Sequence, residues 1–338
     1  MRAYQIAAGS TDLDGLAMVD LPDPEPGPGE VKIRVRATSL NFRDQAIVKG
    51  VYFTGPMAAP QIPLSDGAGE VVAVGEGVTR VKRGDRVAGT FFQTWVDGPP
   101  VPGLRPALGA PPAQGMLAEH VVLHEDGLVA VPSNLSLEEA ACLPCAGVTA
   151  WNALTQGRGV TAGDTVLVLG TGGVSLLALQ LAKAAGARVI ATSSSDEKLA
   201  RAKALGAAAG INYRTTPDWG AAVVEATGGI GADFVVEVGG AGTLGQSMAA
   251  VAPAGEVALI GVLTGTEGNA SPHALMMKGA SLRGIFVGNR AMFEAMNRAI
   301  EANAIKPVVD KVFAFDDAAG AYRYQASESL FGKVVIAV

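Results

Sequence analysis

The chain has little of what several protein classes require. Among its 338 residues are only two cysteines, Cys142 and Cys145, and three histidines, which excludes a disulfide-stapled fold. A formal net charge of −6 without a basic stripe argues against nucleic-acid binding, which needs cations to neutralise phosphates. No run of about 18 apolar residues is present, and the first residues lack the apolar core of a signal peptide. We therefore expect a cytoplasmic protein with no membrane or nucleic-acid partner.

What is present suits a two-domain globular protein, with 49% hydrophobic residues, 17% charged residues and 44 glycines. Residues 1–127 contain short apolar runs between Pro and Gly turns, which predict a β-rich domain. Residues 128–300 alternate between strand and helix patterns. Residues 301–338 return to turns, a short helix and strands, and we expect this tail to close back onto the first domain.

The middle region predicts a doubly wound α/β fold, because its strands alternate with helices. The expected strands are 165–170, 187–193, 208–213, 232–239, 256–262 and 281–287. The expected helices between them are 174–186, 196–206, 219–229 and 243–255. Six strands connected in this way predict a parallel sheet of the Rossmann type.

The stretch VLVLGTGGVS, residues 166–175, predicts a dinucleotide site. A branched apolar strand ends in glycines and a helical pattern follows, so backbone N–H groups and a helix N-terminus face one place. Gly170 allows the tight turn, and Gly172 lets the backbone approach a pyrophosphate, with Gly173 and Val174 beginning the helix. The third position of the G-x-G-x-x-G pattern is Ser175, a residue small enough to keep helix and strand close.

The order of these regions, with the phrases GDTVLVLGTGGV, LAKAAGARVIATSSSDEKL and GKVVIAV, resembles the medium-chain dehydrogenase/reductase superfamily, in its zinc-independent, quinone-oxidoreductase-like branch. The resemblance covers essentially the whole chain. It implies a GroES-like catalytic domain, a Rossmann domain, a cleft between them and hydride transfer with a nicotinamide cofactor. It also implies a homodimer joined through the nucleotide domains.

Zinc-dependent members of that superfamily present three catalytic ligands. Here Asn41 and Ser65 stand where the resemblance would place a cysteine and a histidine, and only Cys145 is retained. Asparagine and serine are poor zinc ligands, and residues 88–118 lack the cysteines of the structural zinc lobe. We therefore expect no metal. Cys142 and Cys145 could also form a redox pair or part of another zinc site. The favoured interpretation is that both are small apolar residues buried on a helix.

The end of the second Rossmann strand favours NADPH over NADH. An NAD site places Asp or Glu there, whereas this strand ends without a carboxylate. Ser193 and Ser194 could donate to a 2′-phosphate and Lys198 supplies a cation, while Tyr213 occupies a contact position implied by the resemblance. In the alternative interpretation Ser194 and Glu197 form a capping box and Lys198 is a solvated helix residue.

Further cofactor contacts are expected where later strands end, at the carboxyl edge of the sheet. They are Gly261, Val262 and Leu263 after the fifth strand, and Val287, Gly288 and Asn289 after the sixth. Thr149 is placed near the nicotinamide by the resemblance alone.

Without zinc, side chains must stabilise negative charge on a substrate oxygen. The segment NFRDQAIVKGVY is similar to a segment of zinc-free quinone and enoyl reductases, and places Asn41, Asp44 and Tyr52 at matching positions. Asn41 offers an amide N–H and Tyr52 a phenol O–H as donors, while Asp44 holds the loop or orients a neighbour. Packing of Tyr52 as a partly buried aromatic is the alternative.

Three functions remain open. The first is an NADPH-dependent reductase of an activated alkene or quinone, acting on a small hydrophobic carbonyl, enone or quinone. The second is a zinc-independent alcohol dehydrogenase or carbonyl reductase, and the third an NADPH-binding protein with little turnover. A Pro/Gly-rich loop at 95–115, preceded by Phe91 and Phe92, predicts an apolar pocket wall.

Overall fold

A computed structural model describes residues 1–52, 55–100, 107–268 and 270–338, so residues 101–106 of the predicted loop lie outside it. Contacts divide the chain into two compact units: unit 1 is Met1–Val148 with Gly288–Val338, and unit 2 is Thr149–Val287. The sequence-based limits at 127 and 300 differ from these. Residues 288–300 belong to unit 1 because, for example, the Arg290 guanidinium pairs with Asp126 at 2.8 Å. No helix in the described ranges is long and apolar enough to cross a membrane.

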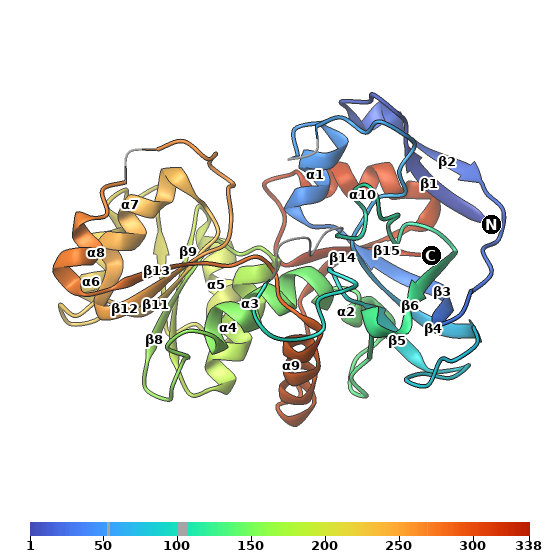
Figure 1. Ribbon diagram of the computed structural model, residues 1–338. Coiled ribbons are helices and arrows are strands. Elements are labelled where there is room, and N and C mark those ends of the chain that lie inside the picture. Colours follow the sequence, from blue (N-terminus) through green and yellow to red (C-terminus); the bar gives the residue numbers. More distant parts are fainter. Residues whose placement is uncertain (53–54, 101–106, 269) are drawn as a thin grey trace. The chain divides into compact units, whose positions relative to one another are not determined.

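Unit 2 is built on a six-stranded parallel sheet with strand order β10-β9-β8-β11-β12-β13 (Figure 1). This order confirms the predicted doubly wound Rossmann-type fold. The strands are β8 (Thr165–Leu169), β9 (Arg188–Ser193), β10 (Ala209–Asn212), β11 (Ala232–Glu237), β12 (Val251–Leu259) and β13 (Ser281–Gly284). The helices are α4 (Gly173–Ala184), α5 (Asp196–Leu205), α6 (Trp219–Ala226), α7 (Ala241–Ala250) and α8 (His273–Lys278), with most of α3 (Val148–Thr155).

One expected helix of unit 2 is shorter than its pattern suggests. The prediction of a helix over 243–255 is wrong in its second half, because α7 ends at Ala250 and Val251 begins β12. Pro253 has no N–H to donate to a helix, and it pushes the preceding residue toward extended backbone. The segment 251–255 therefore starts the strand.

Unit 1 contains a seven-stranded sheet and a separate hairpin. The path of the sheet is β14-β15-β3-β4-β5-β7, and β6 pairs with β3. Its strands are β3 (Glu30–Ser39), β4 (Asp66–Val74), β5 (Arg86–Gly89), β6 (His120–His124), β7 (Leu128–Ala130), β14 (Val309–Ala314) and β15 (Lys333–Ala337); the hairpin is β1 (Arg2–Ile6) with β2 (Leu16–Asp20). The helices are α1 (Phe42–Val48), α2 (Leu137–Ala140), the π-helical turn Leu143–Gly147, α9 (Arg290–Ala302) and α10 (Ala318–Gln325), with short 3₁₀ turns at Leu13–Gly15, Glu125–Gly127 and Phe315–Asp317.

Three neighbouring strands position the polar residues of unit 1. Strand β15 pairs antiparallel with β3, Val335 facing Ser39, and β3 pairs antiparallel with β4, Ser39 facing Asp66. The start of β15, the residues after β3 and the start of β4 therefore meet at one end of the sheet. Lys333, Asn41 and Asp66 come together there although they lie far apart in the sequence.

Candidate functional site

The glycine turn of unit 2 leaves room for a ligand at its backbone. Gly170 follows β8 with φ +71°, a left-handed conformation that favours glycine. Gly172 is the N-cap of α4, and a Cβ added there would meet no atom within 4 Å. Gly173 and Val174 form the first turn of α4, so their N–H groups lie at the positive end of that helix. The residues present fit a pyrophosphate at this turn.

Ser175 explains how the motif works without its third glycine. Its side chain is buried, and its hydroxyl donates a hydrogen bond to the main-chain oxygen of Leu169 at 2.6 Å. Leu169 is the last residue of β8, so this bond ties the first turn of α4 directly to the preceding strand. A small hydrogen-bonded side chain thus keeps the close packing that glycine usually provides.

The predicted ribose-phosphate residues meet where β9 and β10 end. The Tyr213 N–H donates to the Ser193 main-chain oxygen at 3.0 Å, and the Tyr213 side chain is exposed. Ser193 is buried and its Oγ accepts from the Ser195 N–H at 3.2 Å, whereas Ser194 and Lys198 are half-buried.

The N-cap of α5 is not Ser194, which the alternative interpretation of the sequence had placed in a capping box with Glu197. The cap is Ser195, whose Oγ accepts from the Lys198 N–H at 3.3 Å. The capping box of Ser194 with Glu197 is therefore wrong by one residue. The hydroxyl of Ser194 is not the helix cap, which leaves that residue available for the phosphate role.

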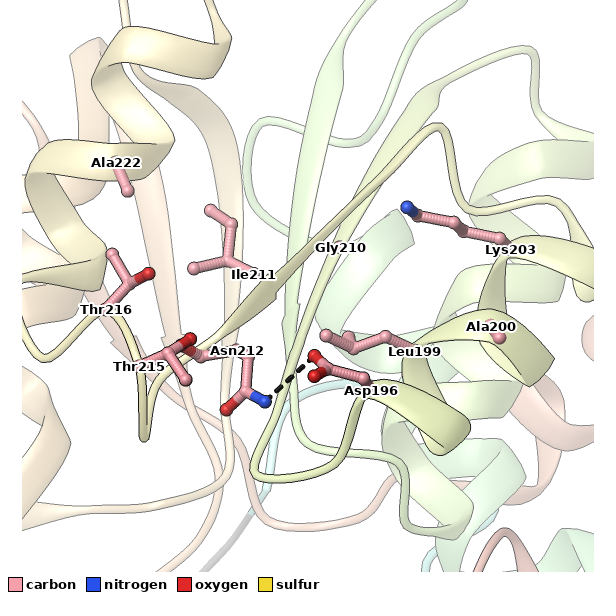
Figure 2. A pocket seen from close by; sticks show the side chains of 10 residues that line it. All are labelled: Asp196, Leu199, Ala200, Lys203, Gly210, Ile211, Asn212, Thr215, Thr216 and Ala222. Atoms are coloured by element: carbon pink, nitrogen blue, oxygen red, sulfur yellow. Dashed lines mark hydrogen bonds between the residues drawn. The ribbon is translucent and has the colours of Figure 1, made fainter.

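A pocket of about 420 Å³ lies beside this corner of unit 2, at the outer edge of the sheet (Figure 2). It is lined by residues of α5, β10 and α6 and by two threonines: Asp196, Leu199, Ala200, Lys203, Gly210, Ile211, Asn212, Thr215, Thr216 and Ala222. The Asn212 amide donates to the Asp196 carboxylate at 2.9 Å across its rim. None of the predicted cofactor residues lines this pocket, so it is distinct from the glycine turn.

The remaining predicted cofactor residues occupy strand ends and helix starts. Gly261, Val262 and Leu263 follow β12, and the last two side chains are exposed. Within unit 2, Thr149 is buried in α3, and the Val287 oxygen accepts from the Asn152 amide at 2.7 Å. Within unit 1, Gly288 precedes Asn289, the N-cap of α9, whose side chain accepts from the Met292 N–H at 2.8 Å.

The carboxylate of Glu237 organises the loop after β11, a role that sequence reasoning missed. This fully buried side chain accepts from the Gly239 and Gly240 N–H groups at 2.7 and 2.9 Å. It also accepts from the hydroxyls of Thr243 and Ser247 on α7. The sequence signal for this role is a glutamate at the end of an otherwise mostly apolar strand, where an unpaired carboxylate would be unfavourable.

The predicted catalytic residues Asn41 and Asp44 lie at the start of α1 in unit 1. Asn41 is the N-cap of α1 in extended conformation, and it forms a capping box with Asp44. Its backbone N–H donates to the buried Asp44 carboxylate at 2.7 Å. Burial raises the pKa of the Asp44 carboxyl to about 6, although the Arg43 guanidinium and the Asn41 N–H oppose the shift.

The Asn41 side chain is committed to a buried ammonium that the sequence analysis did not identify. Lys333 Nζ donates to Asn41 Oδ1 and to the Leu40 main-chain oxygen, both at 2.6 Å. The same nitrogen lies 3.7 Å from Asp66 Oδ2. Lys333 and Asp66 are both buried. Asn41 Nδ2 is buried and has no hydrogen-bond partner among the residues that the structure describes.

Tyr52 lies beside a buried arginine. The Arg43 guanidinium is 5.1 Å from the centre of the Tyr52 ring and 4.8 Å from that of Phe91. Arg43 Nη1 donates to the Leu108 oxygen at 2.8 Å, and Nε donates to the Tyr52 hydroxyl at 3.4 Å. The Tyr52 oxygen thus accepts from a cation. Phe91, Phe92 and Trp95 are buried.

The three positions that match zinc ligands do not fit a zinc ion. Asn41 Oδ1 already accepts from Lys333, and Ser65 Oγ donates to Asp66 Oδ1 at 2.7 Å. Burial raises the pKa of the Cys145 thiol far above its ordinary value, which disfavours the thiolate that binds zinc. The ammonium of Lys333 adds a positive charge to the same cluster. In the described ranges no group of three His, Cys, Asp or Glu residues is placed to bind a metal.

Family comparisons agree with this architecture. Residues 27–133 match the alcohol dehydrogenase GroES-like domain, and residues 173–302 match the zinc-binding dehydrogenase family. A β-rich GroES-like domain with a Rossmann-type nucleotide domain defines a class of nicotinamide-dependent oxidoreductases. The chain belongs to the medium-chain dehydrogenase/reductase superfamily, and it is an NAD(P)H-dependent oxidoreductase.

Individual relatives span several activities. A zinc-type alcohol dehydrogenase-like protein of Schizosaccharomyces pombe is 48% identical, with 89% of each chain covered. A quinone oxidoreductase of Pseudomonas aeruginosa is 34% identical over 89% of this chain and 88% of its own. An NADPH-dependent alkenal/one oxidoreductase of Arabidopsis thaliana is 31% identical, over 89% and 70%. A crystal structure of an NAD-dependent alcohol dehydrogenase is 38% identical with a TM-score of 0.91, and both chains are covered completely.

Proposed function

We propose that the protein reduces an activated alkene or a quinone with NADPH and without zinc. One observation carries the proposal: two of the three zinc-ligand positions hold Asn41 and Ser65, whose side chains are hydrogen-bonded to the buried charges of Lys333 and Asp66. A conjugated acceptor needs only its carbonyl oxygen stabilised while a neighbouring carbon accepts hydride, and hydrogen-bond donors can supply this. The names of the quinone and alkenal/one relatives support the substrate class.

The chain's own residues then have defined roles. The glycine turn at Gly170 and Gly172 holds the pyrophosphate of the cofactor, which supplies the hydride when bound. The Asn41 amide donates to the substrate oxygen, and the Tyr52 hydroxyl donates to the same oxygen or returns a proton to the reduced product. Asp44 fixes the Asn41 backbone through the bond at 2.7 Å.

NADPH preference is the second part of the proposal. The strand that precedes the phosphate corner ends at Ser193 rather than at a carboxylate, and Lys198 lies in the first turn of α5. Asp196 and Glu197 lie on the same turn, and the Asp196 carboxylate accepts from the Asn212 amide at 2.9 Å. One relative of known structure is named an NAD-dependent alcohol dehydrogenase. Tighter binding of NADH than of NADPH would therefore contradict this part of the proposal.

Carbonyl reduction or alcohol oxidation is the competing function, and the names of two relatives, an alcohol dehydrogenase-like protein and an NAD-dependent alcohol dehydrogenase, favour it. An unconjugated carbonyl carbon needs stronger polarisation of its oxygen, which zinc supplies in the zinc-dependent members. Binding of NADPH with little turnover is the remaining alternative.

Initial rates of NADPH oxidation with enones, quinones, enoyl thioesters and aldehydes separate these functions. We expect turnover with conjugated acceptors and little with saturated aldehydes. Aldehyde reduction faster than enone reduction would support a carbonyl reductase. Tight NADPH binding without oxidation by any acceptor would support the binding protein.

We also propose that the chain forms a homodimer through unit 2. Strand β13 is an edge strand of the parallel sheet, and Leu282 on it is 42% exposed. Met276 and Met277 on the preceding α8 are 69% and 70% exposed. An unpaired edge with apolar neighbours favours strand pairing with a second copy. Sedimentation should give a dimer for the wild type and a monomer for Leu282→Asp; a monomeric wild type would contradict the proposal.

A further inference from the structure

Lys333 is a buried cation that no predicted role explains. It begins strand β15, where a charged side chain precedes four apolar residues, and its exposure is 3%. A buried ammonium is expensive unless it is paired and hydrogen-bonded. Here it is both, because the Leu40 oxygen, Asn41 Oδ1 and the Asp66 carboxylate surround it.

The ammonium determines which way the Asn41 amide faces. A lysine ammonium only donates, so the atom at 2.6 Å from Nζ must be the amide oxygen of Asn41. The Nδ2 group then points away from Lys333, and it is buried without a partner among the described residues. An unpaired buried donor is unfavourable, and an arriving acceptor oxygen would pair with it.

Asp66 completes the surroundings of the Lys333 ammonium. The carboxylate of Asp66, held by the Ser65 hydroxyl and the Cys145 N–H at 3.2 Å, in turn anchors the ammonium.

We propose that Lys333 is a positioning residue: it fixes and polarises the Asn41 amide so that Nδ2 donates to the substrate oxygen. This inference rests on the proposed function and deepens it. Pulling electron density toward Oδ1 makes the N–H group a stronger donor, as in other hydrogen-bond chains. A fixed side-chain cation thus takes the polarising part that a metal ion plays in zinc-dependent relatives.

Two substitutions separate this role from a structural one. Asn41→Asp keeps an oxygen for Lys333 but replaces the donor, so we expect kcat to fall on the order of a hundredfold, the effect of losing an oxyanion donor. Lys333→Met leaves the donor free to rotate, and we expect kcat to fall by about tenfold or more with NADPH affinity unchanged. The double variant should be no slower than Asn41→Asp alone, because the two residues act as one unit.

Lys32→Met is the matched control. Lys32 is a 7% exposed lysine on strand β3 of the same sheet, paired with Asp23 and Glu25. We expect both Lys32→Met and Lys333→Met to lower the melting temperature, and only Lys32→Met to leave kcat unchanged. Lys333→Arg should recover part of the activity of Lys333→Met. Additive losses in the double variant, or a wild-type kcat in Lys333→Met, would overturn the proposal.

A structural readout keeps this test separate from the proposed function. If the wild type reduces no acceptor, the proposed function fails, whereas high-resolution structures of the wild type and Lys333→Met still test Lys333. We expect the Asn41 amide to change orientation or hydrogen-bond partner in the variant. An unchanged Asn41 side chain would overturn the positioning role whatever the enzyme reduces.

Discussion

The two polar sites are built in opposite ways. In unit 2, Gly170, Gly172 and Ser175 shape a backbone cradle within one strand–turn–helix segment, and charged side chains have little part in it. In unit 1, Asn41, Asp66 and Lys333 come from three strands or their ends, and buried charges dominate. A backbone cradle suits the cofactor, whose pyrophosphate has the same shape in every reaction. A network of side chains can be altered by substitution to suit a different substrate.

The largest effect should come from placing charge in the backbone cradle. Gly172→Asp puts a carboxylate where an added Cβ meets no atom within 4 Å, so the fold should remain intact. Like charges brought together at a binding site cost several kcal/mol, and NADPH affinity should fall by about a hundredfold or more. Calorimetric titration measures this, with Gly245→Asp on α7 as the control, since its Cβ position is equally open. If both variants bound NADPH with equal affinity, the cofactor phosphates would not bind at this turn.

A smaller loss is expected at the side-chain site. Tyr52→Phe removes a hydroxyl 3.4 Å from Arg43 Nε while retaining the ring beside that guanidinium. We expect kcat with an enone to fall by about tenfold to a hundredfold and NADPH affinity to stay constant. A variant that keeps most of the wild-type kcat would reduce Tyr52 to a packing residue.

Cofactor choice should depend on Lys198 at the phosphate corner. Lys198→Gln should weaken NADPH by about tenfold or more and leave NADH unchanged, because charge-assisted hydrogen bonds contribute about 1.5–3 kcal/mol. Lys203→Gln, further along α5 and beside the 420 Å³ pocket, is the control and should change neither affinity. Equal weakening of both cofactors by Lys198→Gln would argue against a 2′-phosphate contact.

The smallest effect is a pH dependence of stability from Asp44. Its pKa is raised from 3.8 to about 6, so the native state holds an extra proton between these values, and stability falls as pH rises through that window. The change in the pKa from 3.8 to about 6 limits this effect to about 3 kcal/mol. Asp44→Asn stays neutral and should lack the fall. Denaturant unfolding at pH 4 and pH 6.5 measures it; an equal pH dependence in both proteins would contradict a raised pKa.

The same contrast explains what the sequence could predict. The alternating strands and helices of unit 2 and the place of Ser175 follow from local patterns, because strand, turn and helix are contiguous in the sequence. The partners of Asn41 do not follow, since Lys333 and Asp66 reach it only through the pairing of β15 and β4 with β3. The part of Arg43 in the site does not follow either, because its guanidinium lies over the rings of both Tyr52 and Phe91, and Phe91 is far from it in the sequence.

Two finer errors have local causes. The N-cap of α5 is Ser195 because three consecutive serines offer equivalent caps, and the hydrogen bond from the Lys198 N–H selects one of them. The segment after Ala250 joins β12 because Pro253 cannot continue a helix. Propensity alone did not settle either boundary.

The most direct test of the central claim is the rate of NADPH oxidation with an α,β-unsaturated ketone, measured before and after exhaustive chelation with zinc content determined in parallel. Donor side chains around Asn41, Tyr52 and Lys333 should sustain the full rate in protein that holds no stoichiometric zinc. A rate that disappears on chelation and returns with one zinc per chain would contradict the account.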